Sequence, residues 1–323
     1  MELSEDALRS IVAHLAHVRA EYGEVLGEPD LVEPTGDYFP DEFKMEPAAI
    51  SRLMRRMMTY APLATDLDVE VVFAEAEGES GGGGCGSGAC GTGGGKENGP
   101  QGRGKAPDGG VLETEDGYAV VLMASDVGQP KLLTASLARS MGRLVLFEAD
   151  EMVDPRVEGA LSELTAVACG LGVILLSGAC VYKKACGGMK RSQGTFLGVE
   201  ELALAAALFV RMSDRKPSAV RRHLEVTQRE AFDLALDWVD GQPKLVRALS
   251  KDPESLADGI FALEEKKGLL SRLLSRKRDD ADPDALAMSA AGGRARVVKV
   301  RSEEERRRIA ETKALVEEAL QES

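Results

Sequence analysis

Residues 164–181 contain no charged side chain, and Lys183 and Lys184 follow them closely. A run of this length meets the minimum for a helix that crosses a bilayer, and cations often flank such helices. However, many of these residues are Gly, Ala, Ser, Thr or Cys, and Glu163 stands at the head of the run. A second mostly apolar stretch, 202–210, could pair with it inside a folded domain. We therefore expect a buried core helix, with a membrane anchor through 164–181 as the alternative.

The balance of charges narrows the classes of partner. Over 323 residues the formal net charge is −14, which argues against nucleic acid or an anionic membrane as the principal partner. Aromatic residues make up only 4% of the chain, so platforms that stack on bases are not expected. The 44% of apolar residues is sufficient for one large domain or two small ones.

Two further features of the composition predict a cytoplasmic protein. The first residues, MELSEDALRS, are acidic and polar and contain no apolar h-region, so we expect no secretory signal peptide. Five cysteines, an odd number, fit a reducing compartment better than a framework of disulfides.

Hydrophobic spacing predicts a mostly helical α+β fold with a small sheet. The first helix should begin after Ser4, a good N-cap, and a capping box from Thr227 to Glu230 should open the last of the central helices. The expected helices are 4–25, 46–59, 133–147, 198–212, 217–225 and 227–239, and the expected strands are 68–74 and 118–124.

A glycine-rich stretch divides the chain. Residues 78–110 hold 16 of the 35 glycines and almost no apolar side chain, so they cannot recover their ordering entropy by burial. We expect a disordered insertion at 78–112, between an N-terminal unit at 1–77 and a central unit at 113–245. Cys85 and Cys90 lie within the insertion and are weak candidates for metal ligands, because their spacing matches no tight zinc knuckle.

The composition changes again after the central unit. We expect a C-terminal helical tail at 246–323, with an amphipathic helix near 253–276. A final charged helix should begin at 302, where Ser302 and Glu305 form a capping box. Its apolar stripe is thin, which predicts packing on the body or on a partner.

The helix expected over 133–147, LTASLARSMGRLVLF, has an unusual pattern at its centre. In an H-E-x-x-H helix, two histidines four positions apart bind Zn²⁺ and the glutamate between them acts as general base. Arg139, Ser140 and Arg143 occupy those three places here. Arginine is permanently protonated and has only donors, so it cannot ligate a metal.

From about Pro34 to Trp238 the chain resembles a bacterial zincin-like (HExxH metallopeptidase-like) family. Members carry a Y-F-P-D segment, an H-E-L-G-H helix, an acidic third ligand in a run resembling L-T-D-L-L-T-V-F-L-G-L-G, and a G-Y-L-S-x-E-E segment. The matching residues here are Tyr38 to Asp41, Arg139-Ser140-Met141-Gly142-Arg143, Leu161 to Gly172, and Gly194 to Glu201. The resemblance implies a zincin-like helical core whose metal-binding motif has degenerated, with Glu163 at the third-ligand position and no metal or other cofactor.

Two arrangements of this degenerate site are open. If Arg139, Arg143 and Glu163 converge, the two guanidinium groups could replace the charge of the metal and bind the carboxylate in bidentate fashion. Alternatively, both arginines lie solvated on an exposed helix face. A serine nucleophile is not expected, because no histidine lies near Ser140 in sequence.

The other histidines and cysteines suggest structural roles. His14 and His17 lie three apart on the first helix, where we expect surface positions rather than a pair of metal ligands. Cys169, Cys180 and Cys186 lie in or beside the apolar run and are expected to act as small buried residues.

The sequence leaves three functions open. The first is a catalytically inactive metallopeptidase-like protein that acts as a binding or scaffold module for an unknown protein or peptide. The second is a metal-dependent hydrolase with ligands from elsewhere, and the third is a membrane-associated protein anchored through 164–181. The candidate ligands of the second are His14, His17, Glu148, Asp150, Glu151 and Glu163.

Overall fold

The computed structural model describes residues 3–44, 46–74, 110–151, 153–185 and 188–263. The protein has a mostly helical α+β fold with a small sheet, as predicted. Its elements are α1 (Glu5–Leu26), α2 (Pro47–Met58), β1 (Val69–Ala74), β2 (Val111–Glu113), β3 (Tyr118–Met123), α3 (Ala124–Val127), α4 (Pro130–Glu148), α5 (Glu158–Ala166), η1 (Val167–Leu171), α6 (Gly172–Gly178), β4 (Val181–Ala185), β5 (Gly188–Ser192), α7 (Val199–Met212), α8 (Pro217–Arg221), α9 (Val226–Asp240), α10 (Pro243–Lys251) and η2 (Pro253–Leu256).

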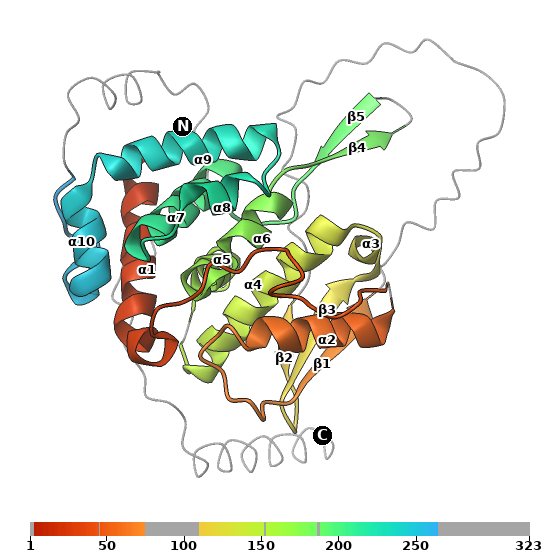
Figure 1. Cartoon of the computed structure of the whole chain (residues 1–323). Coiled ribbons are helices and arrows are strands. Elements are labelled where there is room, and N and C mark those ends of the chain that lie inside the picture. The colour runs from red at the N-terminus through yellow and green to blue at the C-terminus, as the bar shows by residue number, and fades with distance from the viewer. Residues whose placement is uncertain (1–2, 45, 75–109, 152, 186–187, 264–323) are drawn as a thin grey trace, which may run out of the picture.

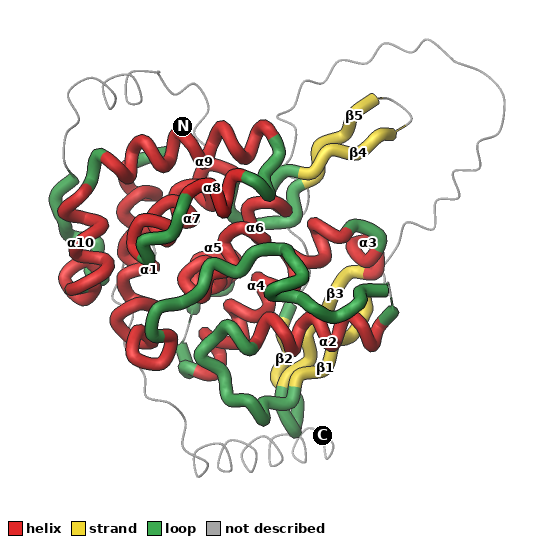
Figure 2. Tube along the Cα trace, viewed as in Figure 1, coloured by secondary structure: helices red, strands yellow, loops and turns green. Residues whose placement is uncertain are grey.

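The helices form one body, and the sheet lies at its side together with α2 (Figures 1 and 2). The three strands have the order β1-β3-β2. β1 runs parallel to β3, with Val69 opposite Tyr118, and β2 pairs antiparallel to β3, with Val111 opposite Val120. A separate antiparallel hairpin, β4–β5, projects from the body (Figure 1).

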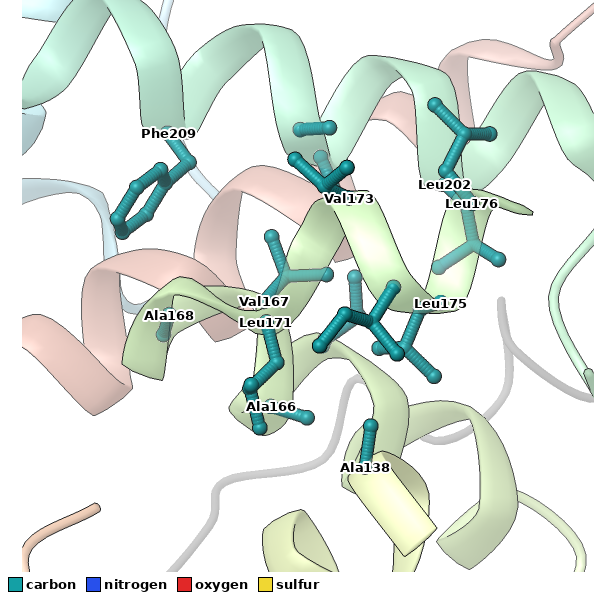
Figure 3. Packing of buried hydrophobic residues seen from close by; sticks show 14 of the residues in the cluster. Ala138, Ala166, Val167, Ala168, Leu171, Val173, Leu175, Leu176, Leu202 and Phe209 are labelled. Atoms are coloured by element: carbon teal, nitrogen blue, oxygen red, sulfur yellow. The ribbon is translucent and has the colours of Figure 1, made fainter. Parts of the chain in front are cut away.

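The uncharged run forms the centre of the core as α5, η1 and α6. Figure 3 shows Val167, Leu171 and Leu175 from this run among the buried side chains. By length and composition, Glu158–Gly178 is the one stretch of the described chain that would suffice to cross a membrane, and 83% of its most apolar window is buried. Its side chains therefore pack as predicted for a core helix.

This central segment bends at Gly170. Gly170 has φ of +93°, and its carbonyl oxygen accepts a hydrogen bond from the Val32 N–H at 3.0 Å. A Cβ at position 170 would lie 1.9 Å from the Asp30 carbonyl oxygen. Glycine is therefore required here both by the positive φ and by the close approach of the loop after α1.

Helix starts follow the sequence signals in part. The Ser4 side chain accepts from the Ala7 N–H at 3.2 Å and caps α1 as predicted. The capping box predicted at Thr227 is wrong: α9 has Glu225 as its N-cap, and the Glu225 N–H donates to the Gln228 side chain at 2.9 Å. The helix therefore begins one residue before the predicted position, because Glu225 and Gln228 form the same reciprocal pattern.

The start of the expected C-terminal tail belongs to the body. α10 was not predicted, and Leu249 and Leu256 join the main core. The helix expected over 253–276 is not found in its described part, where η2 is followed by non-helical chain up to residue 263. Arg9 of α1 donates to the Phe261 carbonyl oxygen, and this hydrogen bond holds the segment against α1. The rest of the tail and most of the glycine-rich insertion, with Cys85 and Cys90, lie outside the described residues.

Candidate functional site

The candidate site lies where α4 crosses α5 (Figure 1). Gly142 makes the crossing possible, since a Cβ at this position would lie 1.9 Å from the Ser162 carbonyl oxygen. The backbones of the two helices are therefore in direct contact, and Arg139 on α4 faces Glu163 on α5. A local helical pattern thus brings two of the residues singled out from the sequence together.

Glu163 is fully buried and bonded through both carboxylate oxygens. Oε1 accepts from the Phe196 N–H at 2.8 Å, and Oε2 accepts from the Leu197 N–H at 2.9 Å. These two donors belong to the segment Gly194–Glu201 that resembles the G-Y-L-S-x-E-E motif. This segment therefore supplies backbone donors to Glu163. The sequence pattern of the segment did not reveal that role.

Arg139 is buried against the same segment, with 3% of its surface exposed. Its Nη1 donates to the Gly194 carbonyl oxygen at 2.9 Å and lies 3.5 Å from Glu163 Oε1. The guanidinium carbon also lies 5.2 Å from the centre of the Phe196 ring. The alternative of a solvated arginine is therefore wrong for Arg139, whose charge is enclosed and paired.

Arg143 does not join this pair. Its Nε lies 2.7 Å from Glu158 Oε1, and its guanidinium carbon lies 5.2 Å from the centre of the Phe147 ring. One turn beyond Arg139 on α4, it meets the first turn of α5 and remains half-buried. The expected convergence of two arginines on Glu163 is therefore wrong, and so is the bidentate geometry, because the single contact comes from Arg139.

A small cavity of about 60 Å³ opens beside these groups. Arg139, Ser140, Arg143 and Glu158 are among its lining residues. This volume is well below the range of about 300–1,000 Å³ typical of small-molecule sites, so the cavity is small for a ligand. Ser140, at the place of the general base, is buried in this wall.

Burial sets the electrostatics of the pair. It raises the pKa of the Glu163 carboxyl to about 7, while the Arg139 guanidinium and the two backbone donors act in the opposite direction. Burial also lowers the pKa of Arg139, and Glu163 opposes that shift. Arginine still remains protonated, because its ordinary pKa exceeds about 12. The site thus encloses a permanent cation beside a carboxylate that gives up its proton near neutral pH.

The residues at the expected metal site do not fit a metal ion. Both guanidinium groups are donors without a lone pair for coordination, and the Glu163 oxygens already accept two backbone N–H groups. Within the described ranges, no group of three His, Cys, Asp or Glu side chains is placed to hold a metal ion. What this arrangement offers is fixed positive charge and hydrogen-bond donors.

His14, His17 and Glu151 of the alternative ligand set lie near one another, with 6.3 Å between the centres of the two imidazole rings. Of the six residues in this set, the structure brings His17 and Glu151 into contact, with 3.0 Å between Nε2 and Oε1. His14 Nε2 lies 2.9 Å from the Thr165 hydroxyl, and Glu148 accepts from the Tyr118 hydroxyl at 2.7 Å.

The expected surface position of His14 is wrong. His14 lies on α1 and packs against α5. Burial lowers its pKa to about 4, and the nearby charge of His17 lowers it further. His17 shows the opposite shift, because its hydrogen bond to Glu151 raises its pKa. The predicted burial of Cys169 and Cys180 is confirmed, and Cys186 lies outside the described residues.

The buried His14 should make the fold sensitive to acid. The unfolded chain takes up a proton near the ordinary pKa of 6.5, whereas folded His14 stays neutral until about pH 4. Its contribution to stability is therefore present above pH 6.5 and is lost between pH 6.5 and 4, by up to about 3 kcal/mol. His14→Gln, which does not titrate, should abolish this loss in urea unfolding measured from pH 4 to 8.

The comparison between protein and variant isolates the histidine. Burial of Glu163 changes stability in the opposite direction, since the free energy of unfolding falls as pH rises from about 4.5 to about 7. Both proteins share this change, so it cancels when the two pH profiles are subtracted. His17→Gln is the control, because the contribution of His17 is lost as pH rises through its raised pKa. Identical pH profiles for the protein and His14→Gln would contradict the assignment.

No protein-family model, curated protein or solved structure matches the chain. The resemblance to zincin-like proteins therefore stays an expectation from the sequence motifs.

Proposed function

We propose that this protein is a catalytically inactive, zincin-like binding or scaffold module of the cytoplasm, with a protein or peptide as its partner. The buried Arg139–Glu163 pair carries the proposal. It lies where the resembling family places the first histidine and the acidic third ligand. A guanidinium enclosed there supplies positive charge to the carboxylate without the coordination chemistry of an ion.

The side-chain contacts of the three histidines also support an inactive protein. His14, His17 and His223 contact Thr165, Glu151 and Glu33, respectively, and none of them contacts Ser140. The Thr165 hydroxyl beside His14 is fully buried and donates to the Leu161 carbonyl oxygen at 2.9 Å. A hydroxyl nucleophile needs both an activating base and access for its substrate, and this arrangement lacks the access.

The edge of the sheet supports a peptide as the partner. β2 is an edge strand of the described sheet, and an edge strand can pair with an extended peptide. Leu112 on β2 is 58% exposed. Gly110, just before this strand, lies against Arg143, since a Cβ there would be 3.2 Å from Nη1. An extended peptide on β2 would therefore run beside the degenerate site.

Measurement of bound zinc and of peptidase activity tests the proposed loss of catalysis. The purified protein should contain only substoichiometric zinc, and neither EDTA nor added zinc should change its melting temperature. It should leave casein and a fluorogenic peptide library intact, while a zinc peptidase with an intact H-E-x-x-H helix cleaves them in parallel. Stoichiometric tight zinc, or cleavage that EDTA suppresses, would contradict the proposal.

Selection of peptides from a displayed random library tests the binding role in the same preparation. Enriched peptides should bind the protein and lose binding to Leu112→Asp, which places a charge at the edge strand. Val25→Asp is the matched control, because Val25 is an exposed aliphatic residue of α1. A library without enriched peptides, or equal binding to both variants, would refute a peptide site at β2.

A further inference from the structure

A second, larger cavity lies apart from the Arg139 site. It has a volume of about 340 Å³ and shares no lining residue with the small cavity beside Arg139. Its walls come from the loop at 34–43, from α2, from the first turns of α4 and from α6. Figure 1 shows this loop crossing over α4 and α6 toward α2. The volume lies within the range of about 300–1,000 Å³ typical of small-molecule sites.

The interior of this cavity is apolar. Phe39, Met57, Leu133 and Ile174 are among its lining residues, and the last three are almost fully buried. The hydroxyl groups of Thr134 and Ser177 in the wall already donate within their own helices, to the Pro130 carbonyl oxygen at 2.9 Å and the Ile174 carbonyl oxygen at 2.8 Å, respectively. The interior therefore favours an apolar ligand body that makes no hydrogen bonds.

The rim on the α2 side is cationic. α2, with the sequence PAAISRLMRRMM, has three arginines and no acidic residue, although the whole chain carries a net charge of −14. Arg52 and Arg56 lie one turn apart and both line the cavity. Arg56 donates Nε to the Tyr38 carbonyl oxygen at 2.9 Å, and within the described chain no hydrogen bond or ion pair involves the exposed Arg52. The N–H groups of Arg52 and the terminal N–H groups of Arg56 can therefore donate to acceptors on a ligand at this rim.

The loop that lines the cavity carries the exposed acids Asp41 and Glu42. Glu42 lies 4.0 Å from the Lys44 ammonium group, which offsets part of its charge. The charges of the loop and of α2 therefore differ in sign, and an anionic group of a ligand is placed against α2. A carboxylate fits this side, because the planar guanidinium fork binds it through two parallel hydrogen bonds.

We propose that this cavity binds a small amphipathic carboxylate, with its alkyl chain inside and its carboxylate on Arg52 and Arg56. The volume of about 340 Å³ lies near the lower end of the range for small-molecule sites, which suits a short ligand. A fatty acid of medium chain length, such as decanoate, matches this size. The site is distinct from the degenerate one, so it does not depend on the proposed loss of peptidase chemistry.

Isothermal titration of the full-length protein with decanoate tests the site. One molecule should bind per chain, and Arg52→Gln should weaken binding about tenfold or more, as expected for the loss of a charged hydrogen bond. Arg55→Gln, on the same helix but outside the cavity, should stay within about twofold of the unmodified protein. Because Arg52 and Arg55 are both exposed, neither variant should impair folding.

Two further measurements separate recognition from nonspecific apolar binding. Decanol, with the same chain and no carboxylate, should bind more weakly than decanoate. Leu53→Trp should fill the mouth and suppress binding, while its thermal unfolding stays cooperative. Absence of decanoate binding, equal binding of decanol, or equal losses in Arg52→Gln and Arg55→Gln would overturn the proposal.

Discussion

Replacing Arg139 by methionine should lower the free energy of unfolding by about 3–5 kcal/mol above pH 7, because Glu163 is then left without its buried cation. For a chain of this size the melting temperature should fall by roughly 10 °C. The loss should be smaller in acid, since Glu163 takes up a proton below its pKa of about 7. Equilibrium unfolding in urea, followed by circular dichroism at several pH values, measures both effects.

Arg143 provides the matched control, since the same substitution one turn away breaks a half-exposed ion pair with Glu158. Arg143→Met should cost about 1 kcal/mol or less. Adding Glu163→Gln to Arg139→Met should recover part of the loss and remove its dependence on pH. Equal losses in Arg139→Met and Arg143→Met, or no recovery in the double variant, would show that the Arg139–Glu163 pair has no special role.

Gly142→Ala should also destabilise the protein, although alanine is the better helix former. Helix propensity alone predicts a gain of about 1 kcal/mol. The new Cβ would however lie 1.9 Å from the Ser162 carbonyl oxygen, so α4 and α5 must move apart. Overpacking of this kind costs about 1–3 kcal/mol and sometimes more, and we expect a net loss of about 2 kcal/mol in urea unfolding.

Gly23→Ala separates propensity from packing. Gly23 also lies within a helix, but a Cβ there would meet only the Arg19 side chain at 3.8 Å, an ordinary contact. This variant should gain up to about 1 kcal/mol. If Gly142→Ala were stabilised to the same extent, the close crossing of α4 and α5 would not exist in solution.

The long elements could be predicted because their apolar residues repeat with a clear period. α1, α2, α4, α7, β1 and β3 lie within a few residues of their expected positions. β2 and the β4–β5 hairpin were missed, since strands of three to five residues contain too few positions to show alternation. α10 was missed for a related reason, because its nine residues follow directly on α9 and begin with a proline.

The candidate site was predictable only where it depends on local spacing. The helical spacing placed Arg139 and Arg143 on one side of α4, and the family resemblance singled out Glu163 at the third-ligand position. The direction of each guanidinium depends on how far along α4 the crossing with α5 lies. That crossing is set by Gly142, whose role depends on the backbone of Ser162 and is not visible in sequence.

Contacts between distant segments account for the rest. The donors to Glu163 are backbone groups of Phe196 and Leu197, and any residue except proline can offer such a group. The burial of His14 depends on α5, more than a hundred residues later. The larger cavity likewise joins α2 to α4 and α6, so neither its volume nor its cationic rim could be deduced from the pattern of α2 alone.

The anchoring of Glu163 has a consequence for folding during synthesis. α4, α5 and α6 leave the ribosome before Phe196 and Leu197, whose backbone N–H groups bind the carboxylate. Until these residues emerge, closing the helices would bury an acid without its donors, at a cost of several kcal/mol. The nascent chain must therefore keep its most apolar stretch partly open during this interval, which is when it would benefit most from a chaperone.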